Sequence, residues 1–374
     1  MADTNATLTS TAPDTITLSR VNTPPAETWN YLKSNDITLT VPSVSRKGDV
    51  YFALPQLFSK IETGMGDKVT NWVTSQAKDA TYIEVARNTV RDEPIVIDID
   101  ADKNQVEDTG IMIREGASAT VVLIAHGSAA DATTSAALTR IVCEKRSHLS
   151  LFELVALSDT GTHLESVGIH ADAEATVDVR QYLLGGATQA VGFCATLAGA
   201  DSRLSLYTRY LGRKDNVLDI NHVVRQRGEN TLAEVVESGV LEDAAKKSLR
   251  ATIDLIHGAK GAKGNEIEHV LVTGDDVTNK TMPVILCDED DVQGNHGATI
   301  GSIGPDQMQY LKDRGLSTQE AEDLYVRAIF DDVVIAAPTA SARQAALTRA
   351  REVLGAEIAN DLTEGLGLSS AEEA

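Results

Sequence analysis

The sequence is poor in aromatic side chains and in cysteine. Phe, Trp and Tyr make up only 4% of the 374 residues, which argues against a core filled by large rings. Stacked layers of Val, Ile, Leu and Ala fit this composition better. The three cysteines, Cys143, Cys194 and Cys287, are odd in number and widely spaced, so they form neither a CxxC motif nor a disulfide framework. We therefore expect a reducing compartment and a cytoplasmic protein.

Positive charge is scarce as well. The chain has 33 Lys and Arg residues against 55 Asp and Glu, which gives a formal net charge of −22. A nucleic-acid backbone or an anionic membrane requires clustered Lys and Arg, so neither is expected as a partner. No apolar run approaches the ~18 residues of a transmembrane helix. Residues 1–15 also lack the basic start and apolar segment of a signal peptide.

Familiar catalytic motifs are missing too. The sequence contains no GxSxG, HExxH, Walker A or GxGxxG pattern. The stretch GAKGAKG at 258–264 lacks the spacing of a phosphate-binding loop, and no helical pattern follows it. It is interpreted as a solvated turn, and we expect this chain to bind no nucleotide.

What the sequence does contain is an internal repeat. From Ile95 to Asp100 apolar and acidic residues alternate, which is typical of a strand with one solvated face. Short apolar runs then recur at steps of 28, 28 and 27 residues, beginning at Val121, Leu149, Val177 and Leu204. Two groups of residues accompany them: Ile113, Ile141, Ile169 and Leu197 seven or eight places earlier, and the small residues Ala119, Ser147, Ala175 and Ser202 two places earlier.

This repeat favours a parallel β-helix. Each unit holds two short strand-like runs, whereas a propeller blade needs four strands and usually ~40 residues. Stacked coils bury ladders of like residues, so they need few aromatic side chains. The fold class predicted is mainly β, a parallel β-helix over residues 93–303, with small residues where the coil turns. An ordinary β-sandwich is the alternative.

Helical segments are expected on both sides of the repeat. Residues 19–92 are predicted to be mainly helical, with starts at Pro24-Pro25, at Leu54 and near Lys68. A helix that begins near Gly304 is stopped by Gly315. A capping box, Ser317 with Glu320, then opens a longer helix.

The sequence also predicts the structure of both chain ends and an apolar stripe on the longer helix. A last helix is expected from about 340 to 362, within a helical region 304–363, and residues 1–18 and 364–374 are predicted to be disordered. The longer helix presents one stripe, which consists of Ala321, Leu324, Tyr325, Ala328, Ile329 and Val333.

The candidates for chemistry cluster between residues 283 and 301. A strand-like run ends at Cys287, an acidic cluster follows at 288–291, and His296 then lies among three glycines and an alanine. A neutral imidazole binds iron-type ions readily, but a histidine capping strand ends in a turn is the alternative. Cys287 is a possible ligand or a small inward-facing hydrophobe. The acidic cluster fits a cation site or, more commonly, a solvated turn.

Three segments together resemble one known family. They are residues 22–33, residues 274–301 with the run His-Gly-Ala-Thr-Ile-Gly, and the helix pair that begins at 306–330. They resemble the SufB/SufD family of iron–sulfur cluster assembly proteins, over about residues 20–337. The His-Gly-Ala-Thr form is similar to the D-type subunit, and this chain has no cysteine before Cys143.

The resemblance implies a scaffold and not an enzyme. Its fold would be a right-handed parallel β-helix flanked by helical parts. It would pair through the β-helix with a SufB-type subunit, or with itself. The C-terminal helices would dock a SufC-type ABC ATPase, which carries the ATPase activity, and sulfur would come indirectly from a cysteine desulfurase.

The resemblance also assigns roles to particular residues. His296 would lie at the subunit interface and contribute to a transient iron–sulfur cluster shared with the partner. Some members carry a cysteine two residues before this histidine, where this chain has Gly294. The docking face for the ATPase would consist of Leu324, Tyr325, Ala328 and Ile329, which could equally pack on the β-helix.

Two other functions compete with this hypothesis. Within the same family, the chain could be a SufB-like scaffold that works as a homodimer with SufC. From another class, a carbohydrate-active β-helix enzyme, a lyase or hydrolase, would have the same repeat. The absence of a recognisable signal peptide and the terminal helical parts weigh against that enzyme.

Overall fold

The computed structural model describes residues 15–27, 33–43 and 53–365. The predicted disorder of residues 1–14 and 366–374 lies outside this part of the chain, as do Trp29 and Leu32 of the expected first helix. Residues 15–18, which were also predicted to be disordered, belong to a strand.

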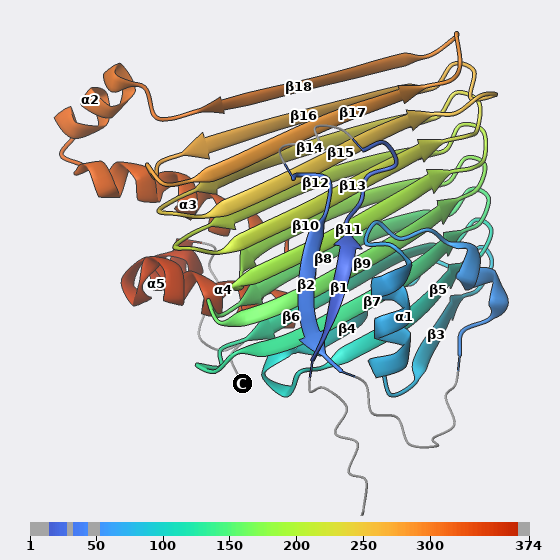
Figure 1. The fold of residues 1–374 in the computed structure, drawn as a ribbon, viewed down its shortest axis with the longest axis horizontal. Coiled ribbons are helices and arrows are strands. Elements are labelled where there is room, and N and C mark those ends of the chain that lie inside the picture. The colour runs from blue at the N-terminus through green and yellow to red at the C-terminus, as the bar shows by residue number, and fades with distance from the viewer. Residues whose placement is uncertain (1–14, 28–32, 44–52, 366–374) are drawn as a thin grey trace, which may run out of the picture.

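Two parallel sheets of eight strands form the body of the protein (Figure 1). Consecutive strands alternate between the sheets, so each coil contributes one strand to each, and the chain forms a parallel β-helix as predicted. The even sheet contains β4 (Ile95–Asp100), β6 (Ser118–Gly127), β8 (His148–Leu157), β10 (Thr176–Gly185), β12 (Arg203–Gly212), β14 (Leu232–Leu241), β16 (Lys263–Val272) and β18 (Gln293–Gly301). The odd sheet contains β3 (Ala80–Val85), β5 (Val106–Ile113), β7 (Thr133–Cys143), β9 (Gly161–Ala171), β11 (Thr188–Leu197), β13 (Val217–Gln226), β15 (Lys246–Leu255) and β17 (Thr278–Cys287).

The register of the strands confirms the repeat in part, since Ile141 lies opposite Ile169 as predicted, whereas Ile113 lies opposite Cys143 and Leu197 opposite Ala171. Val177 lies opposite Leu149 and Leu204 on the neighbouring coils, as the spacing predicts. The first copy was placed wrongly, because Ala119 and not Val121 lies opposite Leu149. The connection between β6 and β7 is two residues longer than that between β8 and β9, which shifts the register. Since strand side chains alternate with a period of two, this shift leaves the inward face unchanged.

The core lies between the two sheets and is almost entirely aliphatic in the first coils. Inward side chains stack in ladders of Val, Ile, Leu and Ala along the solenoid axis. The predicted small residues sit where the coils turn: Ser147, Ala175 and Ser202 are buried there, with Ala117 in place of the predicted Ala119. The β-sandwich alternative is therefore wrong, since every pairing within the two large sheets is parallel.

The N-terminal part covers the outer face of the odd sheet. A hairpin of β1 (Thr15–Val21) and β2 (Ile37–Pro42) packs there with α1 (Asp67–Gln76). The prediction of a mainly helical region is thus wrong, although the helix expected near residue 68 is confirmed. The two β-branched, alternating segments form strands, and the stretch from Leu54 contains only a short 3-10 helix, Gln56–Lys60.

Buried polar contacts fasten this N-terminal part to the sheet. Asn22 Nδ2 donates to Asp219 Oδ1 at 2.8 Å, and Arg250 donates to the same carboxylate at 2.8 and 3.0 Å. Arg250 Nε also donates to the carbonyl oxygen of Ser34 at 2.7 Å. One buried ion pair thereby holds two separate pieces of the N-terminal chain.

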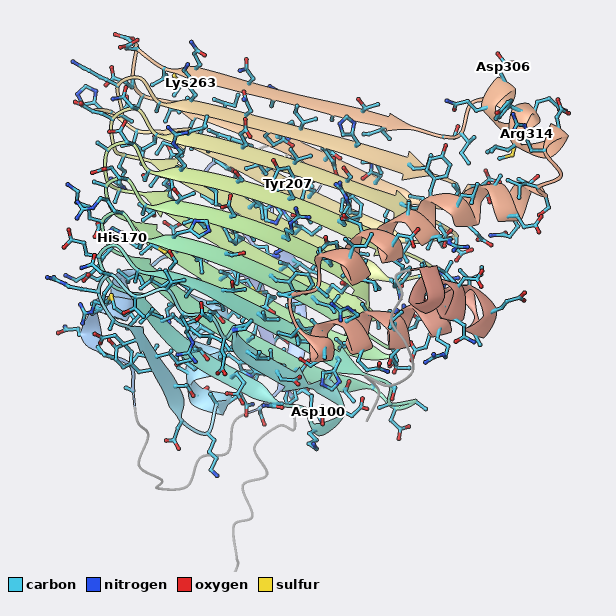
Figure 2. All side chains as sticks on the ribbon, turned by 180° about the vertical axis from the view of Figure 1, so that it is seen from behind. Asp100, His170, Tyr207, Lys263, Asp306 and Arg314 are labelled. Carbon is cyan, nitrogen blue, oxygen red and sulfur yellow. The ribbon has the colours of Figure 1, made fainter. Side chains whose placement is uncertain are left out.

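The C-terminal helices α3 (Thr318–Ala336), α4 (Ala340–Leu354) and α5 (Ala356–Gly365) form a layer on the outer face of the even sheet (Figure 2). The short helix α2 (Pro305–Asp313) precedes them and contacts α3. The predicted capping box at Ser317 is present. The single last helix expected from 340 to 362 is in fact two helices, because Gly355 adopts φ +87° and interrupts it.

Candidate functional site at the open end of the solenoid

The last coil has one side that nothing in the described chain covers. Strands β17 and β18 are the edges of their sheets, and Figure 1 shows β18 at one end of the stack. Ile300 continues an inward-facing ladder from Val270, yet its side chain is 53% exposed. Ile285 and Val292 are only partly buried. Both the backbone edge and the end of the apolar core therefore face outwards here.

His296 lies on this open coil. It belongs to strand β18 and not to a turn, because residues 293–301 pair in parallel with β16. It stands opposite Glu266, which in turn stands opposite Val235, so His296 extends an inward-facing row of the solenoid. No further coil caps this row, and His296 is exposed. The prediction of a functional residue in the last coil stays a prediction, but the structure exposes its side chain.

The glycines around His296 add no side chains to strand β18. A Cβ added at Gly297 or Gly301 would meet no atom within 4 Å, so the described chain does not require glycine there for space. At Gly294 a Cβ would approach Ile285 to 3.1 Å. The edge around His296 thus presents mainly backbone, which a second strand could approach closely.

Cys287 and His296 lie on different strands. It ends β17, in the other sheet, and its thiol donates to the carbonyl oxygen of Glu289 at 3.3 Å. It continues the inward-facing row of Leu255, as the interpretation of an inward residue predicts, but it is exposed. Cys143 and Cys194 are buried, as predicted for core residues, and burial raises the pKa of the Cys143 thiol to about 12.

The acidic cluster is a structured turn. The carboxylate of Glu289 accepts hydrogen bonds from the backbone N–H groups of Gly258 at 2.9 Å and Asp290 at 3.1 Å. The first of these bonds holds the pKa of Glu289 below its usual value. GAKGAKG forms the turn between β15 and β16, as predicted. Within the described residues, no group of three or more His, Cys, Asp or Glu side chains is arranged to hold a metal ion.

Beneath the open end, the core becomes polar. Glu268 lies between the sheets and is completely buried. It accepts hydrogen bonds from Tyr210 Oη at 2.7 Å and Thr281 Oγ1 at 2.6 Å, and it forms an ion pair with Lys247. Because Tyr210 belongs to the even sheet and Lys247 and Thr281 to the odd sheet, this carboxylate connects the two sheets of the last coils.

Buried polar side chains continue from Glu268 towards the middle of the solenoid and form a polar column. His222 is hydrogen bonded to Glu237 at 3.0 Å and to Gln181 at 3.1 Å, and Gln181 donates to Glu153 at 2.7 Å. Burial lowers the pKa of His222 to about 3 and raises that of Glu237 well above its usual value. Burial also raises the pKa of Glu266 to about 8, and both of its oxygens are buried without a hydrogen-bond partner among the described residues.

This column was not predicted from the sequence. A signal for it exists in β16, where Glu266 and Glu268 occupy alternate positions on the face that also carries Val270. The same alternation in β13 aligns His222 with Ile220 and Val224. Charged residues that share a strand face with aliphatic core residues predict buried polar groups, provided that the inward face is known.

The predicted docking stripe is divided by the structure. Leu324 and Tyr325 are 43% and 40% exposed and Ala328 is also exposed, whereas Ile329 is buried against the even sheet. The buried stripe of α3 consists of Ala321, Val326, Ile329, Phe330, Val333 and Val334. Leu324, Tyr325 and Ala328 therefore remain accessible, and their role in docking stays a prediction, whereas Ile329 packs on the sheet.

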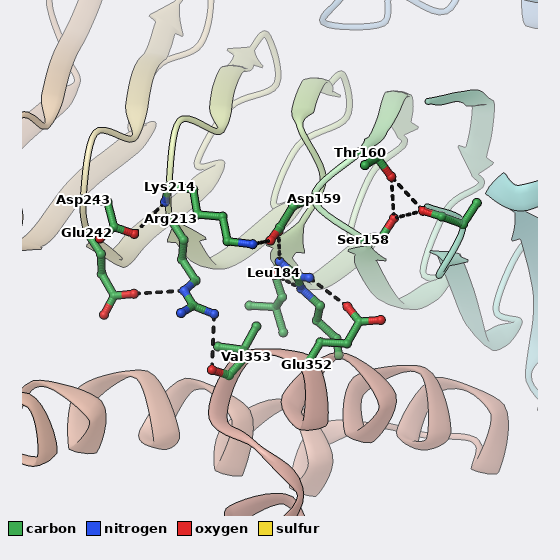
Figure 3. Close-up of polar contacts among 12 residues, drawn as sticks. Ser158, Asp159, Thr160, Leu184, Arg213, Lys214, Glu242, Asp243, Glu352 and Val353 are labelled. Carbon is green, nitrogen blue, oxygen red and sulfur yellow. Dashed lines mark hydrogen bonds and ion pairs between the residues drawn. The ribbon is translucent and has the colours of Figure 1, made fainter. Parts of the chain in front are cut away.

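Arginine side chains fasten the helical layer to the coil turns (Figure 3). Arg349 of α4 is buried and donates to Leu184 O at 2.9 Å, to Asp159 at 2.6 Å and to Glu352 at 2.9 Å. Arg213 donates to the carbonyl oxygen of Val353, near the end of α4, at 3.3 Å. By contrast, α2 buries none of its side chains.

Comparison with known proteins identifies the family. Residues 96–329 match the family model described as "SUF system FeS cluster assembly, SufBD core domain". This match spans more than half of the chain and covers nearly all of β4, β5–β18, α2 and most of α3. The chain therefore belongs to the SufB/SufD family of SUF-system iron–sulfur cluster assembly proteins.

Curated relatives agree with this assignment at low identity. The chain is 28% identical to the iron–sulfur cluster assembly protein SufD of Bacillus subtilis over 127 residues, which are 34% of this chain and 29% of the relative. It is 23% identical to SufD of Escherichia coli over 239 residues, 63% of this chain and 56% of the relative. A SufBD family protein of Methanocaldococcus jannaschii is 24% identical over 179 residues, 48% of this chain and 52% of the relative. The matches thus span about a third to a half of these relatives, and the resemblance is SufD-like.

Among the helices that the structure describes, none combines the length and the apolar character that crossing a bilayer requires.

Proposed function

We propose that this chain is a SufD-like subunit of a SufBCD-type scaffold for iron–sulfur cluster assembly. It would pair with a SufB-type subunit through the open end of the solenoid and dock a SufC-type ATPase on its C-terminal helices. The observation that carries the proposal is the uncovered last coil, on which β18 offers an unpaired edge, an exposed Ile300 and an accessible His296. The family model, which names the SUF system, supports it.

The shape of the open end supports pairing with another strand. An edge strand presents unpaired N–H and C=O groups that a second chain can bind. The glycines of β18 add little steric hindrance, and Ile285, Val292 and Ile300 offer apolar surface to cover. A partner that adds its own edge would bury these groups and enclose His296 between the two subunits.

The ligand set of this chain is incomplete, which favours a shared cluster. An iron–sulfur cluster needs several thiolate or imidazole ligands. The Cys287 thiol is hydrogen bonded to the carbonyl oxygen of Glu289, and Gly294 offers no side chain. In the proposed assembly, the cluster is the cargo, His296 contributes one ligand from this side and the partner supplies the others.

The first experiment tests His296. His296→Ala should lower the yield of assembled cluster severalfold in an anaerobic reconstitution with a SufB-type subunit, a SufC-type ATPase and a cysteine desulfurase. SufC binding should be unchanged, since His296 belongs to an inward-facing row of the solenoid, whereas α3 lies on the outer face of the even sheet. His170→Ala, at a partly exposed histidine on β9, is the control. Equal cluster yields for His296→Ala and the unmodified chain would overturn the proposed role.

The second experiment tests the docking of the ATPase. Leu324→Glu should reduce capture of a SufC-type ATPase in a pull-down, because Leu324 is exposed on α3 and touches little of the even sheet. Val90→Glu places the same charge on an exposed valine far from the helices and should change nothing. If both variants capture the ATPase equally well, its docking surface lies elsewhere.

A homodimeric SufB-like scaffold is the second candidate within the family. The same open end would then pair with a second copy of this chain. Sedimentation of the purified chain together with SufC distinguishes the two arrangements: a stable 2:2 assembly without another β-helix subunit favours the homodimer. The family match gives the carbohydrate-active enzyme no support. The free state of all three cysteines suits the reducing cytoplasm, where we place the protein.

A further inference from the structure

A groove runs along the outer face of the even sheet beside α3, on the side that Figure 2 shows with Tyr207 labelled. Its main part has a volume of about 530 Å³ and an apolar wall made by Val240, Leu271, Ile329 and the ring of Tyr325. This volume and lining are typical of small-molecule sites.

A second, polar hollow continues this groove. It measures about 230 Å³ and is lined by Arg180, Tyr182, Tyr207, Arg209 and Asp332. Arg209 and Asp332 border both hollows, so the two form one continuous groove with an apolar part and a part rich in arginine and tyrosine.

The polar part carries a surplus of positive charge. Its two guanidinium groups face a single carboxylate, Asp332, which lies 3.7 Å from Arg209 Nε and accepts a hydrogen bond from Tyr182 Oη at 3.0 Å. Arg209 Nη1 is buried and has no hydrogen-bond partner within the described residues. Arg180 forms no ion pair within the same part of the chain, and the nearest acidic residue on its own strand, Asp178, faces His148.

We propose that this groove binds an amphipathic anion, a flat aromatic body with a phosphate or carboxylate group. The ring would lie against the apolar wall beside Tyr325. The anionic group would receive hydrogen bonds from Arg180 and Arg209, whose planar donors match both phosphate and carboxylate oxygens. In a chain with a net charge of −22, such a positive spot is selective, because the surrounding surface repels anions that do not also fit the apolar part.

The groove also connects two elements of the proposed scaffold. Thr299 and Gly301 of the edge strand β18 border it on one side, and Tyr325 and Ala328 of α3 on the other. A bound molecule would therefore hold the edge strand against the helical layer. Binding requires only this chain, so its test is independent of whether the chain pairs with SufB or SufC.

The test uses 8-anilinonaphthalene-1-sulfonate, a fluorescent aromatic anion, titrated into the full chain. We expect saturable binding at one site. The double variant Arg180→Gln/Arg209→Gln should weaken it about tenfold, since two charge-assisted hydrogen bonds are lost. Arg203→Gln removes an exposed arginine of β12 outside the groove and should leave binding unchanged. Urea midpoints close to that of the unmodified chain would show that the variants are folded.

Competition then identifies the anionic group. 1-Naphthyl phosphate and 1-naphthoate share a ring and differ only in this group, so the stronger competitor shows which head the arginines prefer. Inorganic phosphate alone should compete poorly, because it does not use the apolar wall. The proposal is overturned by fluorescence that does not saturate, by failure of both naphthyl compounds to compete, or by equal losses in the Arg180→Gln/Arg209→Gln and Arg203→Gln variants.

Discussion

The first and last coils of this solenoid share one backbone design but differ in what they bury. In the first two coils the inward rows are mainly aliphatic, and helices and the N-terminal hairpin cover the outer faces of the early coils. In the last coils the same rows contain Glu237, Glu266, Glu268 and Lys247, and strand β18 is almost entirely exposed. The least complete packing is therefore at the open end of the solenoid, which is the end proposed to bind a partner.

The difference also concerns how the two sheets are held together. Aliphatic ladders tolerate many arrangements, whereas a buried carboxylate requires particular partners at particular distances. Glu268 satisfies this requirement with Tyr210, Lys247 and Thr281. The open end thus has a defined geometry even though no further coil covers it.

The largest expected effect comes from breaking this polar connection. Glu268→Leu leaves Lys247 as an uncompensated buried charge and should lower the free energy of unfolding by about 3–5 kcal/mol. Adding Lys247→Met should recover much of this loss, because the stranded charge is removed as well. Urea denaturation of the single and double variants measures both effects.

Leu123 occupies the equivalent inward row of the first coils and provides the comparison. Leu123→Ala should cost about 2–5 kcal/mol by leaving a cavity. Adding Lys247→Met to Leu123→Ala should bring no recovery, since the two sites share no contact. Recovery in both backgrounds would show that Lys247→Met stabilises the chain for a reason unrelated to Glu268.

A smaller effect is expected where the helical layer meets the coil turns. Asp159→Asn removes the charge that accepts from buried Arg349, and it should cost about 1.5–3 kcal/mol. Far-ultraviolet circular dichroism during urea denaturation checks whether helical signal is lost before strand signal. Loss of both signals together, at an unchanged midpoint, would contradict an anchoring role for this contact.

The stability contributions of the buried carboxyl groups and of the buried histidines should depend on pH in opposite directions. Burial raises the pKa of Glu266 to about 8, so its contribution to stability is complete below the unfolded value near 4.5 and is lost as pH rises through 8. Burial lowers the pKa of His163 and His222 to about 3, so their contribution is present above 6.5 and is lost as pH falls towards 3.

A urea series between pH 6 and pH 9 tests the alkaline side of this profile. Stability should fall over this range, and Glu266→Gln should reduce the fall by about 2–3 kcal/mol because an amide does not ionise. Glu174→Gln, at an exposed turn, is the control and should leave the slope unchanged. The same slope in Glu266→Gln and the unmodified chain would show that Glu266 is ionised at pH 6.

The smallest effect on the isolated chain is expected at the open edge itself. Ile300→Ser alters a half-exposed side chain and should change the free energy of unfolding by no more than about 0.5–1 kcal/mol. In the proposed assembly the same variant should weaken association with the SufB-type subunit clearly, as measured by sedimentation. Unchanged association would argue against pairing through this end.

Much of the fold could be predicted because it is periodic. The stacked runs at Leu149, Val177 and Leu204 occupy matching positions, and the family motif around His296 marks the last coil. The capping box at Ser317 and the helix near Lys68 were predicted from local chemistry alone. Errors arose where local chemistry is ambiguous, as in the N-terminal hairpin, whose short alternating strands need the odd sheet to cover them.

The candidate site was predicted only in outline. Sequence placed His296 near Cys287, but their strands belong to different sheets. It also assigned Leu324 and Ile329 to one stripe, although only Ile329 meets the sheet. Periodicity states which face a side chain shares with its neighbours in the chain; it does not state which element covers that face.

The sequence by itself determined the coil repeat, the position of His296 at its end and the helical character of the segment after Gly304, because each depends on residues close together in the chain. The tertiary structure decided the polar column and the groove beside α3. Glu268 meets Tyr210, and Arg209 meets Asp332, only because stacked coils and a returning helix bring distant positions together. Register and helix docking, which no local pattern encodes, thus decide the chemistry of the open end and of the groove.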